Sequence, residues 1–169
     1  NASQTGTITV DGTIVADNLV VGASTGSNSF NVALNNLSSA AGTTTISSSA
    51  TLYNTGTTRF GDNYNDIFNF LGGVTANASS GISINASQIN ATASAISLNS
   101  PTTMENSVTL SPGVGRITLG ATTVNPGATL TLGAGAATPI TLSSISGTTG
   151  VKSNITINTT DAVTVSGAI

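Results

Sequence analysis

The chain has no cysteine, histidine or tryptophan, and only 5% of its 169 residues are charged. Without cysteine it has no disulfide scaffold, no thiolate nucleophile and no cysteine-ligated metal. Without histidine it lacks the commonest general base and metal ligand. Its three Lys and Arg residues cannot form the basic surface that nucleic-acid binding requires, and no run reaches the roughly 18 apolar residues of a membrane-spanning helix. These absences predict no enzyme, no metal, no cofactor, no nucleic-acid partner and no membrane insertion.

Small polar residues dominate what is present. Thr (30), Ser (23), Gly (19) and Asn (18) make up more than half of the chain, yet 38% of its residues are hydrophobic. That hydrophobic fraction, together with the low charge, argues against disorder. Thr, Ser, Asn and Gly are poor helix formers, and no apolar stripe with a helical period is sustained. The chain is therefore predicted to be all-β.

One unit recurs along the chain: an apolar residue, a Thr or Ser, and a second apolar residue, which is the alternation of a half-buried strand. It occurs at Ile8-Thr9-Val10, Ile82-Ser83-Ile84, Ile96-Ser97-Leu98, Val108-Thr109-Leu110, Ile117-Thr118-Leu119, Leu130-Thr131-Leu132, Ile140-Thr141-Leu142, Ile155-Thr156-Ile157 and Val163-Thr164-Val165. Less regular relatives are Leu19-Val20-Val21, Val32-Ala33-Leu34 and Phe68-Asn69-Phe70. Short strands separated by turns at this spacing are typical of sandwiches, barrels and solenoids.

The scarcity of aromatic residues separates these architectures. Four Phe, two Tyr and no Trp are too few for a sandwich core, whereas a stack of rungs has a narrow core that aliphatic residues fill. We therefore expect a β-solenoid of the right-handed parallel β-helix type, with two triplets per turn, rungs of about 20–24 residues and roughly seven or eight rungs. Residues 1–169 would form one elongated domain, looser over 1–80 and more regular over 81–169. The residues expected to point inward are Ile82, Ile84, Ile96, Leu98, Val108, Leu110, Ile117, Leu119, Leu130, Leu132, Ile140, Leu142, Ile155, Ile157, Val163 and Val165.

Three segments of the chain resemble known repeat sequences. They are TTRFGDNYNDIFNFLGGVTANA (57–78), ENSVTLSPGVGRITLG (105–120) and ATPITLSSISGTTGVKSNITINTTDAVTVSGAI (137–169). They resemble the repeats of filamentous-haemagglutinin-like adhesins and autotransporter passengers, which are large bacterial surface proteins. That resemblance implies a right-handed parallel β-helix that extends from the cell as a fibre, stalk or adhesin. Residues 5–24 (TGTITVDGTIVADNLVVGAS) are instead similar to phage tail-fibre shafts.

Both resemblances imply an extracellular or cell-surface structural role. We expect a structural subunit or shaft segment of a fibre or adhesin, with identical chains as partners in a homo-oligomer or filament. One alternative is a pilus-like or phage tail-fibre subunit completed by neighbouring chains. Another is a β-helix that binds or cleaves carbohydrate, with a surface carbohydrate as its partner.

The six acidic residues are the candidates for catalysis or cation binding. Glycoside hydrolysis needs two carboxylates that converge about 5–9.5 Å apart, and only Asp62 and Asp66, with Arg59 nearby, are close in sequence. Asp62, Asn63, Asn65 and Asp66 could also supply oxygen ligands to calcium. However, the unit occurs once, and an Asx-rich turn is the simpler interpretation. The remaining acidic residues are Asp11, Asp17, Glu105 and Asp161.

Two further groups of side chains have alternative roles. Asn-x-Ser/Thr sequons are possible glycosylation sites if the source glycosylates, but their amides could instead form ladders along the stack. They are Asn1, Asn36, Asn77, Asn85, Asn90, Asn154 and Asn158. The aromatic group could be a binding platform, although core filling or end covering is the favoured interpretation. It comprises Tyr53, Phe60, Tyr64, Phe68 and Phe70.

The two ends of the chain are the predicted assembly edges. Short, apolar and nearly uncharged strands there invite strand addition from a neighbour. The edge residues are Thr7, Ile8, Thr9, Val10, Val163, Val165 and Ile169. We expect a neighbouring copy to contact residues 1–22 or 155–169 and to bury over about 1,000 Å².

Overall fold

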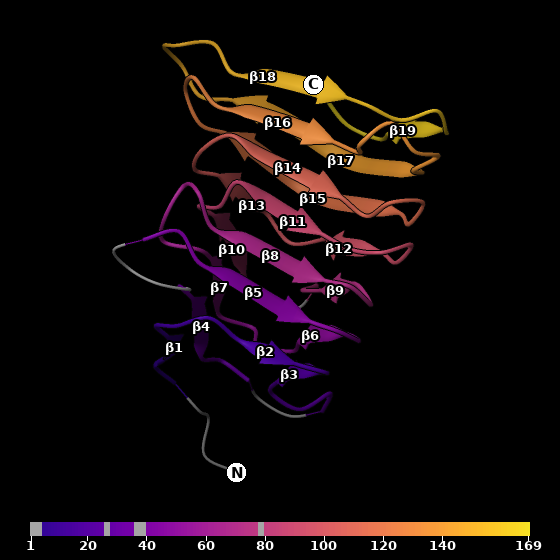
Figure 1. The fold of residues 1–169 in the computed structure, drawn as a ribbon. Helices are drawn as coiled ribbons and strands as arrows, with labels where there is room; N and C mark the ends of the chain where they lie inside the picture. The colour runs from indigo at the N-terminus through magenta and orange to yellow at the C-terminus, as the bar shows by residue number, and fades with distance from the viewer. Residues whose placement is uncertain (1–4, 26–27, 36–39, 78–79) are drawn as a thin grey trace.

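The computed structural model describes residues 5–25, 28–35, 40–77 and 80–169, and these form parallel strands stacked in rungs (Figure 1). No helix occurs in this part of the chain, so none there could cross a membrane. The strands pair between rungs, each with the strand that lies roughly one turn earlier or later in the sequence. The prediction of an all-β parallel solenoid is confirmed.

Each rung has three strands, which form three faces that we call face 1, face 2 and face 3. Face 1 contains β1 (Thr7–Val10), β4 (Asn31–Leu34), β7 (Thr57–Phe60), β10 (Gly81–Ile84), β13 (Thr102–Met104) and the second halves of β15 (Ile117–Val124) and β17 (Ile140–Gly147). Face 2 contains β2 (Val15–Ala16), β5 (Thr43–Ile46), β8 (Ile67–Phe70), β11 (Gln88–Asn90), β14 (Val108–Ser111), β16 (Thr129–Leu132) and β18 (Asn154–Ile157). Face 3 contains β3 (Leu19–Val21), β6 (Ala50–Leu52), β9 (Val74–Thr75), β12 (Ile96–Leu98), the first halves of β15 and β17, and β19 (Val163–Val165).

Face 3 of the fifth rung continues without a loop into face 1 of the sixth rung through β15. Face 3 of the sixth rung continues in the same way into face 1 of the seventh through β17. Residues 117–119 of β15 pair with β12, and residues 122–124 pair with β13. Position 120 at the corner of β15 requires glycine, because a Cβ there would lie 2.2 Å from the carbonyl oxygen of Asn99. The close approach of two backbones thus explains a glycine inside a strand.

The number of rungs matches the prediction, whereas the number of strands per rung does not. Face 2 is a seven-stranded sheet, which gives seven rungs and a rod of roughly 35 Å at the usual strand spacing. The expected two strands per turn is wrong, because β2 and β9 have only two residues each and leave no triplet in the sequence. The rung spacing varies from 20 residues between Ile82 and Thr102 to 31 between Leu19 and Ala50.

The predicted core residues point inward, as the strand register requires. Twelve of the sixteen are buried, from Ile82 through Leu142. Ile155 and Ile157 pair in register with Leu130 and Leu132, so they point to the same side, but they are 36% and 43% exposed. Val163 and Val165 likewise follow Ile140 and Leu142. These four belong to the seventh rung, which has no described rung beyond it.

Some threonines point inward, contrary to the simple alternation. Thr58, Thr102 and Thr122 lie in the inward column of face 1 and are buried. The Thr102 hydroxyl donates to the Ser100 carbonyl oxygen at 2.9 Å, and the Thr122 hydroxyl donates to that of Gly120 at 3.1 Å. The Thr58 hydroxyl donates to the Asn54 Oδ1 atom at 3.2 Å. Each of the three buried hydroxyls therefore has a partner, and its burial carries no unpaired-group penalty.

Most of the aromatic group belongs to the core of the third rung. Phe60, Phe68 and Phe70 are fully buried, with ring centroids 5.6–5.8 Å apart. Tyr53 is half-buried, and Tyr64 is exposed in a loop. Core filling is therefore confirmed for the three phenylalanines, which occupy the middle of the stack and do not cover an end.

Candidate functional site

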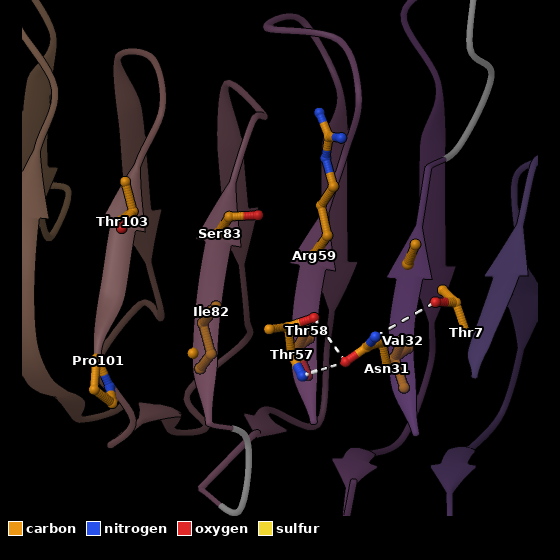
Figure 2. A pocket seen from close by; sticks show the side chains of 12 residues that line it. Thr7, Asn31, Val32, Thr57, Thr58, Arg59, Ile82, Ser83, Pro101 and Thr103 are labelled. Atoms are coloured by element: carbon orange, nitrogen blue, oxygen red, sulfur yellow. Dashed lines mark hydrogen bonds between the residues drawn. The ribbon is translucent and has the colours of Figure 1, made fainter. Parts of the chain in front are cut away.

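A recess lies on the outer surface of face 1, across β1, β4, β7, β10 and β13 (Figure 2). It has a volume of about 470 Å³. Small side chains beside a large one create this recess: Ala33 and Ser83 occupy the outward positions in register with Arg59, on the strands to either side of it. Because these positions are 24–26 residues apart in sequence, only the rung spacing brings them together.

Arg59 forms one wall of this groove. Its Nε donates to the Gly61 carbonyl oxygen at 2.9 Å, and its Nη2 lies 3.6 Å from a carboxylate oxygen of Glu105. Glu105 follows β13, so the guanidinium group spans β10 to reach it. On the other side of the groove, the Asn31 Oδ1 accepts hydrogen bonds from the backbone N–H and the hydroxyl of Thr57, at 2.8 and 3.0 Å.

The groove also offers unused hydrogen-bonding capacity. Within the described residues, the hydroxyls of Ser83 and Thr103 have no hydrogen-bond partner, and both line the groove. Together with Arg59 they place hydrogen-bonding groups on a surface that Pro101 and Ala33 make partly apolar. Such a surface suits a ligand with many hydroxyl groups.

Asp62 and Asp66, the two carboxylates that are close in sequence, lie in the loop between β7 and β8, where Asp66 has a structural role. Asp66 is fully buried, and its carboxylate accepts hydrogen bonds from the backbone N–H groups of Gly42 (2.8 Å), Asp62 and Asn63 (both 3.1 Å). It therefore ties the 61–66 loop to the preceding rung. The Asn63 side chain accepts from the N–H of Asn65 at 3.0 Å, which is an Asx turn. Where the structure describes the chain, no three His, Cys, Asp or Glu side chains lie close enough to hold a metal ion.

Asp62 lies in the same loop and is partly buried. Burial raises the pKa of this carboxyl above its ordinary value, and the nearby Asp66 carboxylate raises it further. Its Oδ1 atom is buried without a hydrogen-bond partner. The charged form of Asp62 therefore lacks the hydrogen bonds that the Asp66 carboxylate receives.

The sequon asparagines differ in exposure. Asn85 and Asn90 are half-buried and take part in amide ladders: the Asn90 amide donates to Asn69 at 3.0 Å, and the Asn85 Oδ1 accepts from Asn106 at 2.6 Å. The Asn77 Oδ1 accepts from the Ser97 hydroxyl at 3.3 Å. Asn154 and Asn158 are exposed on the last rung. Asn1 and Asn36 lie outside the described residues.

The ends of the stack expose strand edges and core side chains. Eight of the eleven exposed large hydrophobic residues of the described chain lie on the first rung, on the seventh rung or, for Ile169, directly after the seventh rung. They are Ile8, Val15, Val20, Val151, Ile155, Ile157, Val163 and Ile169. Of the predicted edge residues, Thr7, Thr9, Ile8, Val163 and Ile169 are exposed, and Val10 and Val165 are half-buried.

Val15 and Val20 are additional end residues, 82% and 62% exposed at outward positions. The sequence signal for Val20 is the unbroken apolar run Leu19–Val21, which departs from the alternation seen elsewhere. Outward residues on the other strands of face 3 are Thr or Ser: Thr51, Thr75, Ser97, Thr118, Thr141 and Thr164.

No protein-family model, curated protein or solved structure matches the chain.

Proposed function

We propose that this protein is a structural subunit or shaft segment of an extracellular fibre or adhesin, and that it self-associates through the open strand edges of its first and last rungs. The observation that carries the proposal is the concentration of exposed apolar side chains on these two rungs. Exposed apolar side chains next to unpaired strand edges invite association with another chain. The resemblance of residues 57–169 to bacterial surface repeats supports the extracellular location.

The mechanism is cohesive and not catalytic. Backbone hydrogen bonds run along the rod axis, and a continuous apolar core lies inside them. A neighbour that adds a rung extends both at once, because it pairs the free N–H and C=O groups and covers Ile155, Ile157 and Val163. All seven strands of each face already pair within one chain, which favours stacking of complete solenoids over a pilus-like or phage-fibre exchange of strands.

Electron microscopy of the purified chain tests this proposal. We expect filaments or rods much longer than the roughly 35 Å of one copy, whereas a strand-exchanged fibre would give trimeric rods. The variant Val163→Lys with Val165→Lys should remain monomeric, because it places two charges in the joint. The matched control Thr109→Lys with Thr118→Lys adds the same charge at outward positions of the fifth rung and should still assemble. A native chain that stays monomeric at high concentration would overturn the proposal.

Carbohydrate binding in the face 1 groove is a second candidate function. The unpaired hydroxyls of Ser83 and Thr103, on the two strands that follow Arg59 across the groove, favour it. A panel of surface glycans tested against the native chain should identify a ligand whose affinity falls at least tenfold in Arg59→Ala. Arg116→Ala, which removes the same charge from face 3, should leave that affinity unchanged. We expect no cleavage of any glycan in the panel.

A further inference from the structure

The groove on face 1 runs along the rod axis, across the strands of that face. It crosses five consecutive strands from β1 to β13 and therefore extends over four strand spacings, or roughly 19 Å. We propose that it binds an uncharged glycan with a straight chain, which lies lengthwise in the groove with about one sugar over each rung. This proposal rests on the candidate carbohydrate-binding function of the groove and adds the class of glycan and its direction.

Outward side chains along one side of the groove form a column with one residue on each rung. Ala33, Arg59, Ser83 and Thr103 are in register on β4, β7, β10 and β13. Figure 2 shows the last three of them on neighbouring strands. Neighbouring strands lie about 4.8 Å apart, and a sugar in a straight 1,4-linked chain has nearly the same length. Successive sugars of such a chain therefore meet equivalent positions on successive rungs.

This column supplies free hydrogen-bonding groups for sugar hydroxyls. The Ser83 and Thr103 hydroxyls and the Nη1 atom of Arg59 have no hydrogen-bond partner within the described chain. A Ser or Thr hydroxyl both donates and accepts, as a sugar hydroxyl does. Ala33 and Pro101 add apolar surface to the lining, against which the C–H groups of sugar rings can pack.

The floor of the groove favours a glycan over a peptide. Strands β4, β7, β10 and β13 pair with one another through their backbones, so the floor has few free backbone groups. An extended peptide carries a backbone donor and acceptor on nearly every residue, and it usually finds partners for them at a sheet edge. A glycan on the face of the sheet can bind to side chains with some hydroxyls and leave the others in water.

The charges around the groove favour an uncharged glycan. Among the described residues that line it, Arg59 is the only charged one, and the Glu105 carboxylate lies 3.6 Å from its guanidinium group. Asp11 and Asp62 follow β1 and β7 at the same corner of the rod. An acidic glycan would therefore meet more negative than positive charge, and like charges placed together oppose binding.

A length series of uncharged, straight oligosaccharides tests the fit along the rod. The probes are β-1,4-linked manno- and cello-oligosaccharides of two to six sugars, titrated into the native chain by calorimetry. Affinity should rise with each added sugar and level off at about four or five sugars, where the ligand spans the groove. Malto-oligosaccharides, whose α-1,4 linkages produce a coiled chain, should show no such rise.

A matched acidic ligand tests the charge preference. An oligomannuronate with β-1,4 linkages has the ring configuration of the manno-oligosaccharide, but a carboxylate replaces each hydroxymethyl group. It should bind about tenfold more weakly or less than the neutral chain of the same length at low salt, because of the surrounding carboxylates. Added salt should narrow the difference, since it screens charge.

Substitutions in the column test the place of binding. Ser83→Leu fills the middle of the groove and should abolish the gain in affinity with length. The matched control Thr131→Leu adds the same side chain at an outward position of face 2 and should bind like the native chain. Ser83→Ala with Thr103→Val removes both free hydroxyls and should lower the affinity about tenfold. Circular dichroism of each variant checks that it is folded.

The outcomes separate this proposal from the carbohydrate-binding function on which it rests. An oligomannuronate that binds as tightly as its neutral counterpart, or a folded Ser83→Leu variant that binds like the native chain, would overturn the proposal. If no straight, uncharged oligosaccharide binds but another glycan binds through Arg59, the proposal fails and carbohydrate binding in the groove stands. If no glycan binds at all, both fail.

Discussion

Strands β16 and β18 carry the same apolar–Thr–apolar triplet and lie one rung apart on face 2. Leu130 and Leu132 in β16 are fully buried, whereas Ile155 and Ile157 in β18 are more than a third exposed. The side chains point in the same direction and have similar size. The difference arises because β16 has a rung on both sides and β18 has one on only one side.

The comparison shows that position in the stack, as well as strand pattern, sets how much each rung stabilises the protein. In a repeat architecture each unit contacts only its neighbours, so an end unit gains about half of the contacts of a middle one. The same exposure that weakens an end rung makes it available to another copy. The exposure of an end rung therefore lowers its contribution to stability and leaves it available for association.

The largest expected difference is between core truncations in the middle and at the end. Phe68→Ala removes a fully buried ring from the third rung and should lower the free energy of unfolding by about 3–5 kcal/mol. Ile157→Ala in the dilute monomer should cost under about 1 kcal/mol, because its side chain is already partly in water. Denaturant titration of both variants measures this. Equal losses would show that the last rung is as well packed as the middle.

Two glycines in the middle rungs, Gly120 and Gly81, allow a comparison between a crowded and an open backbone position. Gly120→Ala forces a Cβ into the Asn99 backbone and should destabilise by about 1–3 kcal/mol. Gly81→Ala meets nothing closer than 3.9 Å at the start of β10 and should be neutral or slightly stabilising. Thermal unfolding of the two variants provides the measurement. A Gly120→Ala protein as stable as Gly81→Ala would contradict the close approach at this corner.

A smaller effect distinguishes inward from outward threonines. Thr102→Val removes a buried hydroxyl that donates to Ser100 and should cost about 0.5–1.5 kcal/mol. Thr103→Val changes an outward hydroxyl that has no partner in the described chain and should alter stability by a few tenths of a kcal/mol at most. Denaturant titration should rank the two in this order, and the reverse order would place Thr102 outside the core.

The smallest effect is the pH dependence of Asp62. Because the pKa of Asp62 is raised in the folded protein, its charged form opposes folding above that pKa, and the penalty disappears as the pH falls through it. Asp62→Asn should therefore be more stable than the native chain at neutral pH, and the gap should close on acidification. Melting temperatures measured from pH 7 to pH 3 test this sign. A gap that widens at low pH would contradict the raised pKa.

The sequence was sufficient to predict the inward and outward sides of most strands, because the triplets alternate with the strand period. It could not predict the third face, since a two-residue strand such as β9 carries no periodicity. Nor could it predict that Thr102 points inward, because the Ser100 carbonyl that satisfies its hydroxyl becomes a partner only at a folded corner. The groove on face 1 could not be predicted from the sequence for a similar reason, because Ala33, Arg59 and Ser83 become neighbours only through the register between rungs.

Hydrogen exchange, measured strand by strand at low and high protein concentration, tests the central claim that incomplete rungs at the ends drive association. In dilute solution we expect strong protection in β8, β11 and β14 and weak protection in β2, β3, β18 and β19. At high concentration protection should rise in those four end strands and stay unchanged in the middle. End strands that exchange equally fast at both concentrations, or that are as protected as the middle in the monomer, would contradict the account.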